Sequence, residues 1–408
     1  MGNIRKVSIV AGSAILPTRV CSAFSLMGWP SSLYPSHQRL PLSTVASPVV
    51  RVTARSKSRS LATVYCADAE DDSTKPTTLL IGSQQDAASC AMINALLAKG
   101  NWIEATVVHD TTHDTNYRES QVWKHATSPV SLWSVQGSLI DLDDADQLWM
   151  DQFSSACLDN RSWQKERPSD VIFLSKHVAR SGTPALCVHP IGLADPTSSC
   201  QAGGRPGRCP PPSPRLASCL RELRRSTQAA GLDDVFEATL EVTHHGPWLE
   251  TPAMFVEIGS TEGQWGRADA GEVWAETLSR LLGLDGEPTG ENWASLDSSL
   301  RADRAVYVGF GGGHYAPRFG DLARQEGRYI GHMLASYNLN FGEGGRWREA
   351  VTEAIQSTRE AFPGAGGGVK GGVAALIDKK AFRAADREEL LRHLEGLGVE
   401  HRFKSSEC

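Results

Sequence analysis

Short apolar runs alternate with amphipathic segments along most of the chain, and this alternation constrains the fold more than any other feature. The apolar runs are of strand length and too uniformly apolar for strands with one solvated face. They lie at residues 77–81, 105–108, 171–174, 185–188, 236–242, 253–258 and 305–310. The segments with helical periodicity lie at 86–99, 272–282, 321–334, 346–361 and 387–394. Strands that alternate with helices predict an α/β domain with a largely parallel central sheet and helices on both faces.

The first 67 residues differ in composition from the rest of the chain. They contain eight Lys or Arg, twelve Ser and no Asp or Glu, whereas the whole chain carries a net charge of -6. A basic, Ser-rich and acid-free leader is typical of an organelle transit peptide, and a disordered tail is the alternative. The Ser and Val content favours the chloroplast over the mitochondrion. A cytoplasmic location follows if the leader is not a transit peptide.

The same composition predicts the domain boundaries. We expect a disordered transit peptide at 1–67, an acidic spacer at 68–76 and a single domain at 77–405. Residues 194–214, which are rich in Pro, Gly, Ser and Cys, predict a surface loop within that domain.

Bulk properties exclude several classes of protein. No stretch approaches the roughly 20 apolar residues of a membrane-spanning helix, so we expect no membrane partner. The nine cysteines include no CxxC pair, which argues against a disulfide framework or a thiolate zinc site. The acidic body does not by itself suggest a nucleic-acid partner, because phosphates are usually bound by a patch of Lys and Arg. No stable protein partner is indicated.

Polar residues stand near the carboxyl ends of four predicted strands, where ligands bind in open α/β sheets. They are Ser175, Lys176 and His177 in the first place, His189 in the second, Thr243, His244 and His245 in the third, and residues 311–318 in the fourth. The His244-His245 pair precedes Gly246-Pro247, which forces the chain to turn and exposes both imidazoles. Neutral imidazole is the commonest metal ligand, so this pair is a candidate metal site, although such pairs are more often structural.

The fourth place has the sequence Gly311-Gly312-Gly313-His314-Tyr315-Ala316-Pro317-Arg318. Three glycines allow the backbone amides to turn toward one point and form an anion nest. His314 is a candidate metal ligand or general base, Tyr315 a stacking or hydrogen-bonding group, and Arg318 a ligand for phosphate or carboxylate. A glycine turn with a capping His is the alternative.

Glu257 lies among core residues of the predicted strand at 253–258, where a carboxylate is costly unless it is paired or bound to a metal. It is a candidate general acid or base, or a partner that orients a His. An ion pair with an Arg is the alternative. Because the chain has no GxSxG, Walker A or HExxH motif, chemistry based on His and a carboxylate remains, with or without a metal.

Six blocks of sequence that contain these residues follow one another along the chain. They are Ser-Lys-His at 175–177, Pro-Ala-Leu-Cys-Val-His-Pro-Ile-Gly at 184–192, Gly-Gly-Arg-Pro-Gly at 203–207, Thr-His-His-Gly-Pro at 243–247, Met-Phe-Val-Glu-Ile-Gly-Ser-Thr-Glu at 254–262 and Gly-Gly-Gly-His-Tyr-Ala-Pro-Arg at 311–318. In this combination the chain, from residue 77 to about residue 403, resembles the archaeal and plant type of D-aminoacyl-tRNA deacylase. It departs from the family pattern at Gly263, where a second Glu is common, and at Cys187, where Thr is usual.

The resemblance implies hydrolysis of D-aminoacyl-tRNA to free D-amino acid and tRNA, including N-alkylated D-aminoacyl adducts. It implies a fold akin to purine nucleoside phosphorylases and peptidyl-tRNA hydrolases, and zinc as a cofactor. We expect a catalytic and metal-binding set of His244, His245, Glu257 and His314. The substrate-binding residues expected with it are Lys176, His177, His189, Gly311, Gly312, Gly313, Tyr315, Arg318 and Glu262. A nucleosidase or phosphorylase on the same fold and a non-catalytic tRNA-binding module are the alternative functions.

Overall fold

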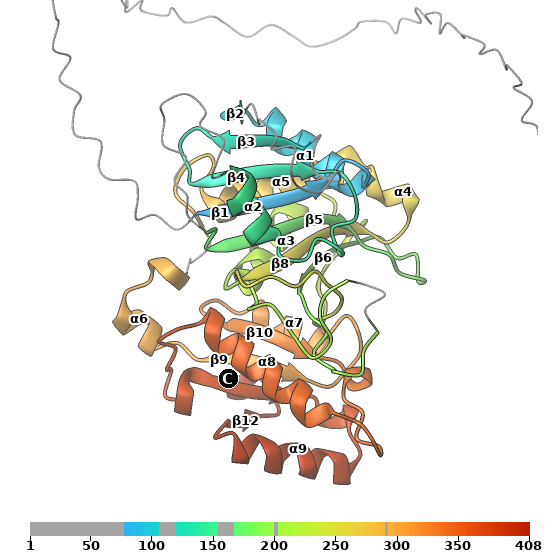
Figure 1. The fold of residues 1–408 in the computed structure, drawn as a ribbon, viewed down its shortest axis with the longest axis vertical. Coiled ribbons are helices and arrows are strands. Elements are labelled where there is room, and N and C mark those ends of the chain that lie inside the picture. The colour runs from blue at the N-terminus through green and yellow to red at the C-terminus, as the bar shows by residue number, and fades with distance from the viewer. Residues whose placement is uncertain (1–76, 106–119, 154–166, 200–202, 290–292) are drawn as a thin grey trace, which may run out of the picture. The chain divides into compact units, whose positions relative to one another are not determined.

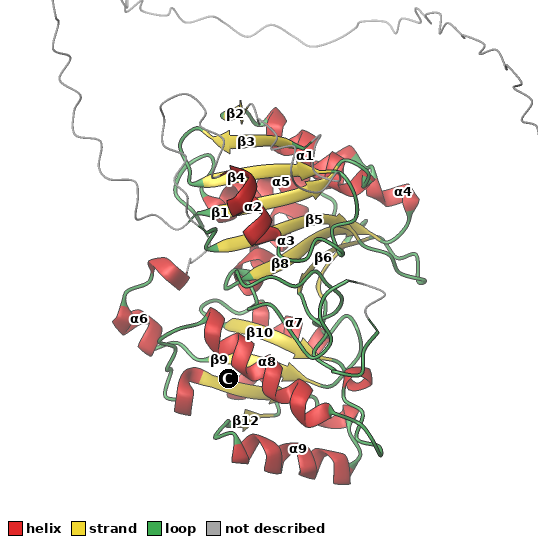
Figure 2. Ribbon diagram, viewed as in Figure 1, coloured by secondary structure: helices red, strands yellow, loops and turns green. Residues whose placement is uncertain are grey.

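The computed structural model describes residues 77–105, 120–153, 167–199, 203–289 and 293–408. All of them belong to one unit that spans residues 68–408, and Figures 1 and 2 show its elements. The predicted transit peptide at 1–67 and acidic spacer at 68–76 lie outside the described residues. Of the strand predicted at 105–108, only residue 105 is described.

A mostly parallel sheet of eight strands organises the first part of the unit, in the order β2-β3-β4-β1-β5-β8-β6-β7. The strands are β1 (Thr78–Ser83), β2 (Trp102–Ala105), β3 (Gln121–His125), β4 (Val130–Val135), β5 (Asp170–Lys176), β6 (Ala185–Pro190), β7 (Glu237–Leu240) and β8 (Ala253–Gly259). Strands β4, β1, β5 and β8 run parallel to one another, as do β6 and β7. The β6–β8 pair is antiparallel, and so are the pairs that β3 makes with β2 and β4.

Helices cover both faces of this sheet, which explains why its central strands are almost wholly apolar. Leu80 belongs to the core that contains α1 (Ala87–Ala98), α3 (Leu216–Ala229) and α5 (Ala268–Leu282). Leu79 and Ile81, on the opposite face of the same strand, belong to the core that contains Trp149 of α2 (Ala145–Phe153). The short helix α4 (Glu262–Trp265) follows β8.

A second, fully parallel sheet follows in the order β10-β9-β11-β12. Its strands are β9 (Val306–Phe310), β10 (Tyr329–Leu334), β11 (Val373–Ile377) and β12 (His401–Arg402), and its helices are α6 (Ser298–Ala302), α7 (Pro317–Ala323), α8 (Trp347–Ala361) and α9 (Ala384–Gly396). Backbone hydrogen bonds join the segment after β7 to this sheet: Val242 donates to the His314 carbonyl at 3.0 Å and Thr243 to the Met333 carbonyl at 2.8 Å.

The predicted α/β class with a largely parallel sheet is confirmed, whereas the division into two sheets was not predicted. The helix predicted at 321–334 is wrong, because α7 ends at Ala323 and residues 329–334 form the buried strand β10. β10 can lie close to α8 because residue 331 is a glycine. A Cβ atom on residue 331 would be only 2.4 Å from Thr358 Cγ2 of α8. No helix among the described residues has both the length and the apolar character needed to cross a membrane.

Candidate active site

Five histidines and two glutamates from both sheets meet at one place. They are His177, His189, Glu241, His244, His245, Glu257 and His314. Strand register explains part of this cluster, since Glu257 on β8 lies opposite Ser175 of β5 on one side and Cys187 of β6 on the other. His189 lies within β6 rather than after it, and Glu241 is the residue that follows β7.

Glu241 lies at the centre of the cluster and is fully buried. Its Oε2 atom is 3.1 Å from His314 Nε2 and 3.6 Å from His244 Nε2, and its Oε1 atom is 3.2 Å from His177 Nδ1. It was not predicted as a site residue, because it fell inside the predicted strand at 236–242. The available signal was the one that identified Glu257, a carboxylate in an otherwise apolar strand.

Glu257 is also buried, and its neighbours are histidines rather than the Arg of the alternative interpretation. Its Oε2 atom is 3.4 Å from His177 Nδ1 and 3.7 Å from His189 Nε2. Burial alone would raise the pKa of Glu257, but the two His rings outweigh it and lower the pKa to about 2. Burial lowers the pKa of His177, yet contact with Glu257 and the charge of Glu241 raise it overall. The cluster therefore holds Glu257 as a carboxylate and favours an imidazolium at His177.

His189, His244 and His245 form a group whose ring nitrogens lie within 4.8 Å of one another. Each Nδ1 faces a backbone carbonyl: that of Pro190 at 3.1 Å for His189, Val242 at 2.8 Å for His244 and Gly246 at 2.6 Å for His245. Because a carbonyl can only accept, each Nδ1 carries a proton, and the neutral rings of His244 and His245 keep a lone pair on Nε2.

The protonation of this group suits metal binding. Burial and the neighbouring His rings hold the pKa of His244 well below its usual value and lower that of His245 to about 4, so both are neutral near pH 7. His189 differs, because Glu257 raises its pKa against the effect of burial. The buried Nε2 of His189 has no hydrogen-bond partner among the described residues. The lone pairs of His244 and His245 suit a zinc ion, and His189 could join them as a ligand once its Nε2 proton is displaced.

A cavity of about 470 Å³ adjoins the cluster. Its lining includes His177, His244, His245, Glu257 and His314, together with Ser83, Gln85, Asp86, Gly137, Ser138, Leu139, Ile140, Ser175, Lys176 and Val178. Asp86 shapes the rim, since its carboxylate accepts from Ala88 N at 2.8 Å and from Lys176 N at 3.1 Å. The Lys176 ammonium lies 5.1 Å from the ring centroid of Trp265. The cavity thus combines a reactive His–Glu wall with a cationic group at its rim.

Several of the predicted substrate-binding residues lie elsewhere. Arg318 donates to the Phe403 carbonyl at 3.1 Å and lies 3.4 Å from Asp378, so its guanidinium contacts the C-terminal segment instead of the cavity. Glu262 is the exposed first residue of α4, and neither residue lines the cavity. Tyr315 does not line it directly, but its hydroxyl is 3.0 Å from His177 Nε2.

The predicted anion nest is only partly available. Gly311 and Gly312 adopt positive φ angles of 101° and 81°, as the glycine-rich sequence suggested. The Gly311 amide, however, donates to the Leu334 carbonyl at 2.8 Å, which corrects its assignment as an oxyanion donor. The amides of Gly312 and Gly313 remain candidates for that role.

Comparisons with known proteins agree on one family. A family model described as D-aminoacyl-tRNA deacylase matches residues 164–402, a segment that contains all seven residues of the cluster. The D-aminoacyl-tRNA deacylase of Arabidopsis thaliana is 35% identical over 333 residues, which cover 78% of this chain and 95% of that protein. The D-aminoacyl-tRNA deacylase of Methanosarcina acetivorans is 32% identical over 231 residues, which cover 56% of this chain and 65% of that protein.

One solved structure, described as a conserved protein of unknown function, shares the fold. It superimposes with a TM-score of 0.60 at 25% sequence identity and covers 81% of this chain and 96% of its own.

Proposed function

Because this chain belongs to the D-aminoacyl-tRNA deacylase family, a family of ester hydrolases, we propose that its His–Glu cluster cleaves the ester between a D-amino acid and the terminal ribose of tRNA. The products are free D-amino acid and tRNA, and N-alkylated D-aminoacyl esters are further substrates. The observation that carries the proposal is the pair of buried carboxylates, each in contact with histidines that line the cavity.

The proposal includes a zinc ion held by the Nε2 atoms of His189, His244 and His245. Their protonated Nδ1 atoms and the approach of their ring nitrogens to within 4.8 Å of one another support this ligand set. His189 replaces His314 and Glu257 of the sequence-based set, since His314 Nε2 faces Glu241 and Glu257 faces His177. When bound, zinc would polarise the ester carbonyl or lower the pKa of a water molecule.

The other residues supply the proton transfer. A carboxylate only accepts, so Glu241 fixes the proton of His314 on Nε2 and leaves Nδ1 as the basic nitrogen. Nδ1 lies 3.0 Å from the Tyr337 hydroxyl, at the exposed side of the ring. His314 takes a proton from the attacking water as the water oxygen bonds to the carbonyl carbon. The bond between that carbon and the ribose oxygen then breaks, and His314 passes the proton to the ribose oxygen. Gly312 and Gly313 stabilise the oxyanion, and Lys176 binds the terminal phosphate.

The proposal is tested with D-tyrosyl-tRNA and L-tyrosyl-tRNA, each incubated with the protein before and after chelation of divalent metals. If the protein hydrolyses only the D ester, and if chelation abolishes this hydrolysis and added zinc restores it, both the deacylase and the zinc proposals are supported. D-selective loss that survives chelation contradicts the zinc proposal alone. If folded protein cleaves neither ester, the deacylase proposal fails, and nucleosides incubated in parallel show whether a base is released instead.

A separate proposal concerns residues 1–67, which we take to direct the protein to the chloroplast on the basis of their basic, Ser-rich and acid-free composition. Residues 1–76 fused to a fluorescent protein should bring it into plastids of leaf cells. Fluorescence in mitochondria or throughout the cytoplasm would contradict this location.

A further inference from the structure

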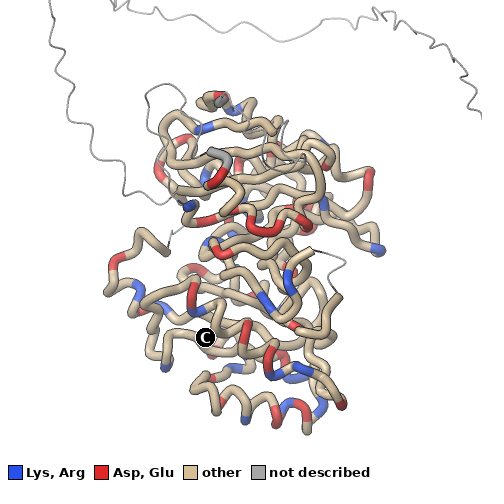
Figure 3. The backbone as a smooth tube through the Cα atoms, viewed as in Figure 1, with Lys and Arg blue, Asp and Glu red and all other residues tan. Residues whose placement is uncertain are grey.

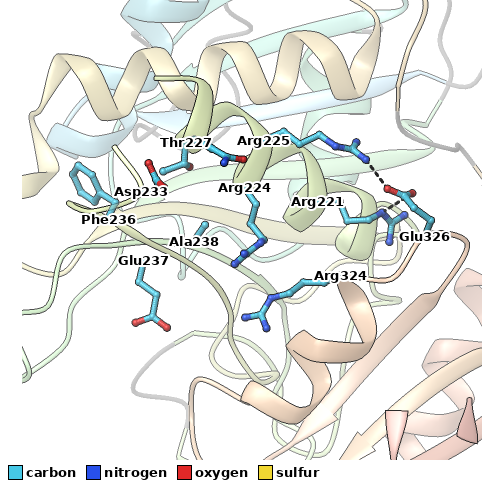
Figure 4. Close-up of a pocket in the computed structure, with 11 residues that line it drawn as sticks. Arg221, Arg224, Arg225, Thr227, Asp233, Phe236, Glu237, Ala238, Arg324 and Glu326 are labelled. Carbon is cyan, nitrogen blue, oxygen red and sulfur yellow. Dashed lines mark hydrogen bonds and ion pairs between the residues drawn. The ribbon is translucent and has the colours of Figure 1, made fainter. Parts of the chain in front are cut away.

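A second hollow, of about 510 Å³, lies between α3, β7 and the end of α7 (Figure 4). Its lining consists of Arg221, Arg224, Arg225, Thr227, Gln228, Asp233, Phe236, Glu237, Ala238, Arg324 and Glu326. Figure 3 marks Lys and Arg in blue and Asp and Glu in red along the backbone, and three acidic residues, Asp233, Glu237 and Glu326, also line this hollow. We call this hollow the arginine groove, because four of its lining residues are arginines.

Two of the four arginines are bound within the protein. Arg221 donates to the carbonyls of Ala323 and Gln325 at 2.8 and 3.1 Å and lies 3.3 Å from Glu326. Arg225 pairs with Glu326 at 2.5 Å and also with Glu222. These contacts attach α3 to the end of α7, so both residues have a structural role.

Arg224 and Arg324 are different. Within the part of the chain that the structure describes, no hydrogen bond or ion pair is found for the exposed Arg224, and Arg324 pairs only with Asp321 of its own helix, at 2.6 Å. Both side chains point into the groove, where Asp233 and Glu237 lie toward the Phe236 side (Figure 4). Both guanidinium groups can donate to an anion that enters the groove. Their planar donor geometry suits phosphate oxygens.

The groove is connected to the active site by two elements. Strand β7 begins at Glu237, which lines the groove, and leads directly to Glu241 in the cluster, a span of about 13 Å at the usual rise per residue. Helix α7 begins three residues after His314 and ends next to Arg324. β7 is the last strand in the order of its sheet, and its residues Glu237 and Ala238 line the groove.

We propose that Arg224 and Arg324 bind backbone phosphates of the tRNA acceptor end, a few nucleotides from the ester that enters the cavity. This inference rests on the proposed function, since it assumes that the same tRNA occupies both places. One strand carries a phosphate about every 3.4 Å along a stacked helix, so a span of about 13 Å corresponds to a few nucleotides.

Binding of uncharged tRNA tests the groove independently of catalysis. The R224Q/R324Q variant should bind tRNA about tenfold more weakly than the full-length wild type. The slope of log affinity against log salt concentration should be smaller in magnitude by about one to two. The matched control is R383Q/R392Q, which removes two exposed charges from the region of α9 and should bind as the wild type does. Equal affinity and salt slope for R224Q/R324Q and the wild type would overturn the proposal.

Hydrolysis gives the second measurement. In R224Q/R324Q, kcat/KM for D-aminoacyl-tRNA should fall about tenfold, and the fall should come from a higher KM. The kcat/KM for D-aminoacyl-adenosine should not change, because this ester has no phosphates for the arginines to bind. An equal loss on both substrates would show damage to the active site and overturn the proposal. If the wild type binds tRNA through these arginines but cleaves neither ester, the deacylase function fails while the phosphate site stands.

Discussion

At the scale of single residues, the unusual feature is Glu241, a fully buried carboxylate whose ion-pair partners among the described residues are three histidines. Glu241→Gln keeps the shape of the side chain but removes the charge that fixes the His314 proton on Nε2. We expect kcat for the D ester to fall about 10²-fold or more, which is the range for loss of general-base function. The control Glu389→Gln changes a half-buried glutamate of α9, which pairs with Arg348 away from the site, and should keep wild-type kcat. The rate constant is measured under single-turnover conditions. If E241Q has the same single-turnover rate constant as the wild type, Glu241 does not have this role.

Asp170 and Arg215 form a buried ion pair that stabilises the fold. Asp170, at the start of β5, lies 3.4 Å from Arg215 and accepts from Ser213 at 3.0 Å, and burial raises its pKa to about 6 despite the nearby guanidinium. Asp170→Asn leaves Arg215 buried without a counter-charge and should lower the free energy of unfolding by about 3–5 kcal/mol. The double variant D170N/R215M should recover most of this loss. Urea denaturation of the wild type, D170N and D170N/R215M measures the free energy of unfolding of each. A decrease below about 1 kcal/mol for D170N would contradict the expectation.

At the scale of elements, the segment between β7 and β8 presents His244 and His245 and is fixed by a close backbone approach. A Cβ atom on Gly246 would lie 2.3 Å from Gly204 N and 2.7 Å from Ile140 O. Backbone atoms cannot move aside as side chains do, so Gly246→Ala should displace the segment. We expect a loss of about 1–3 kcal/mol of stability and loss of D-ester hydrolysis.

The matched control is Gly396→Ala at the end of α9, where a Cβ atom would meet nothing within 4 Å. It should change stability by no more than about 1 kcal/mol and leave hydrolysis intact. Thermal melts and initial rates of the two alanine variants make the comparison. Similar behaviour of both would show that the contacts of Gly246 do not position the histidine pair.

At the scale of the whole molecule, the site lies where the two sheets meet, and a bound zinc ion would join β6 to the segment after β7. An ion that binds only the folded protein stabilises it by about 2.7–4.1 kcal/mol at 100 to 1,000 times its Kd. Chelation should therefore lower the Tm by several degrees, and zinc rather than magnesium should restore it.

His245→Ala should have a lowered Tm that no longer responds to zinc, whereas His401→Ala, an exposed residue of β12, should respond as the wild type does. Scanning calorimetry of the wild type and the two variants, each in apo and zinc-treated form, gives the six Tm values. A Tm for H245A that still rises with zinc would exclude this residue from the ligand set.

The sequence by itself determined the α/β class, since strand-length apolar runs such as 171–174 and 253–258 are buried under helices wherever they pack. It also selected four candidate site residues: His244, His245 and His314 because they follow predicted strands, and Glu257 because a carboxylate within an apolar strand is costly. The blocks of sequence around them resemble the family that the comparisons show.

Only the tertiary structure decided which of these residues meet. Residues 329–334 form a strand because β9 and α8 enclose them, which overrides their local helical pattern. Glu241 and His189 join the site because antiparallel β6 places its residues beside β8, and β7 lies next to β6. Arg318 leaves the site because its partners, Asp378 and Phe403, are distant in sequence. Local patterns record burial and periodicity, whereas partners across sheets depend on strand order and register, which periodicity does not specify.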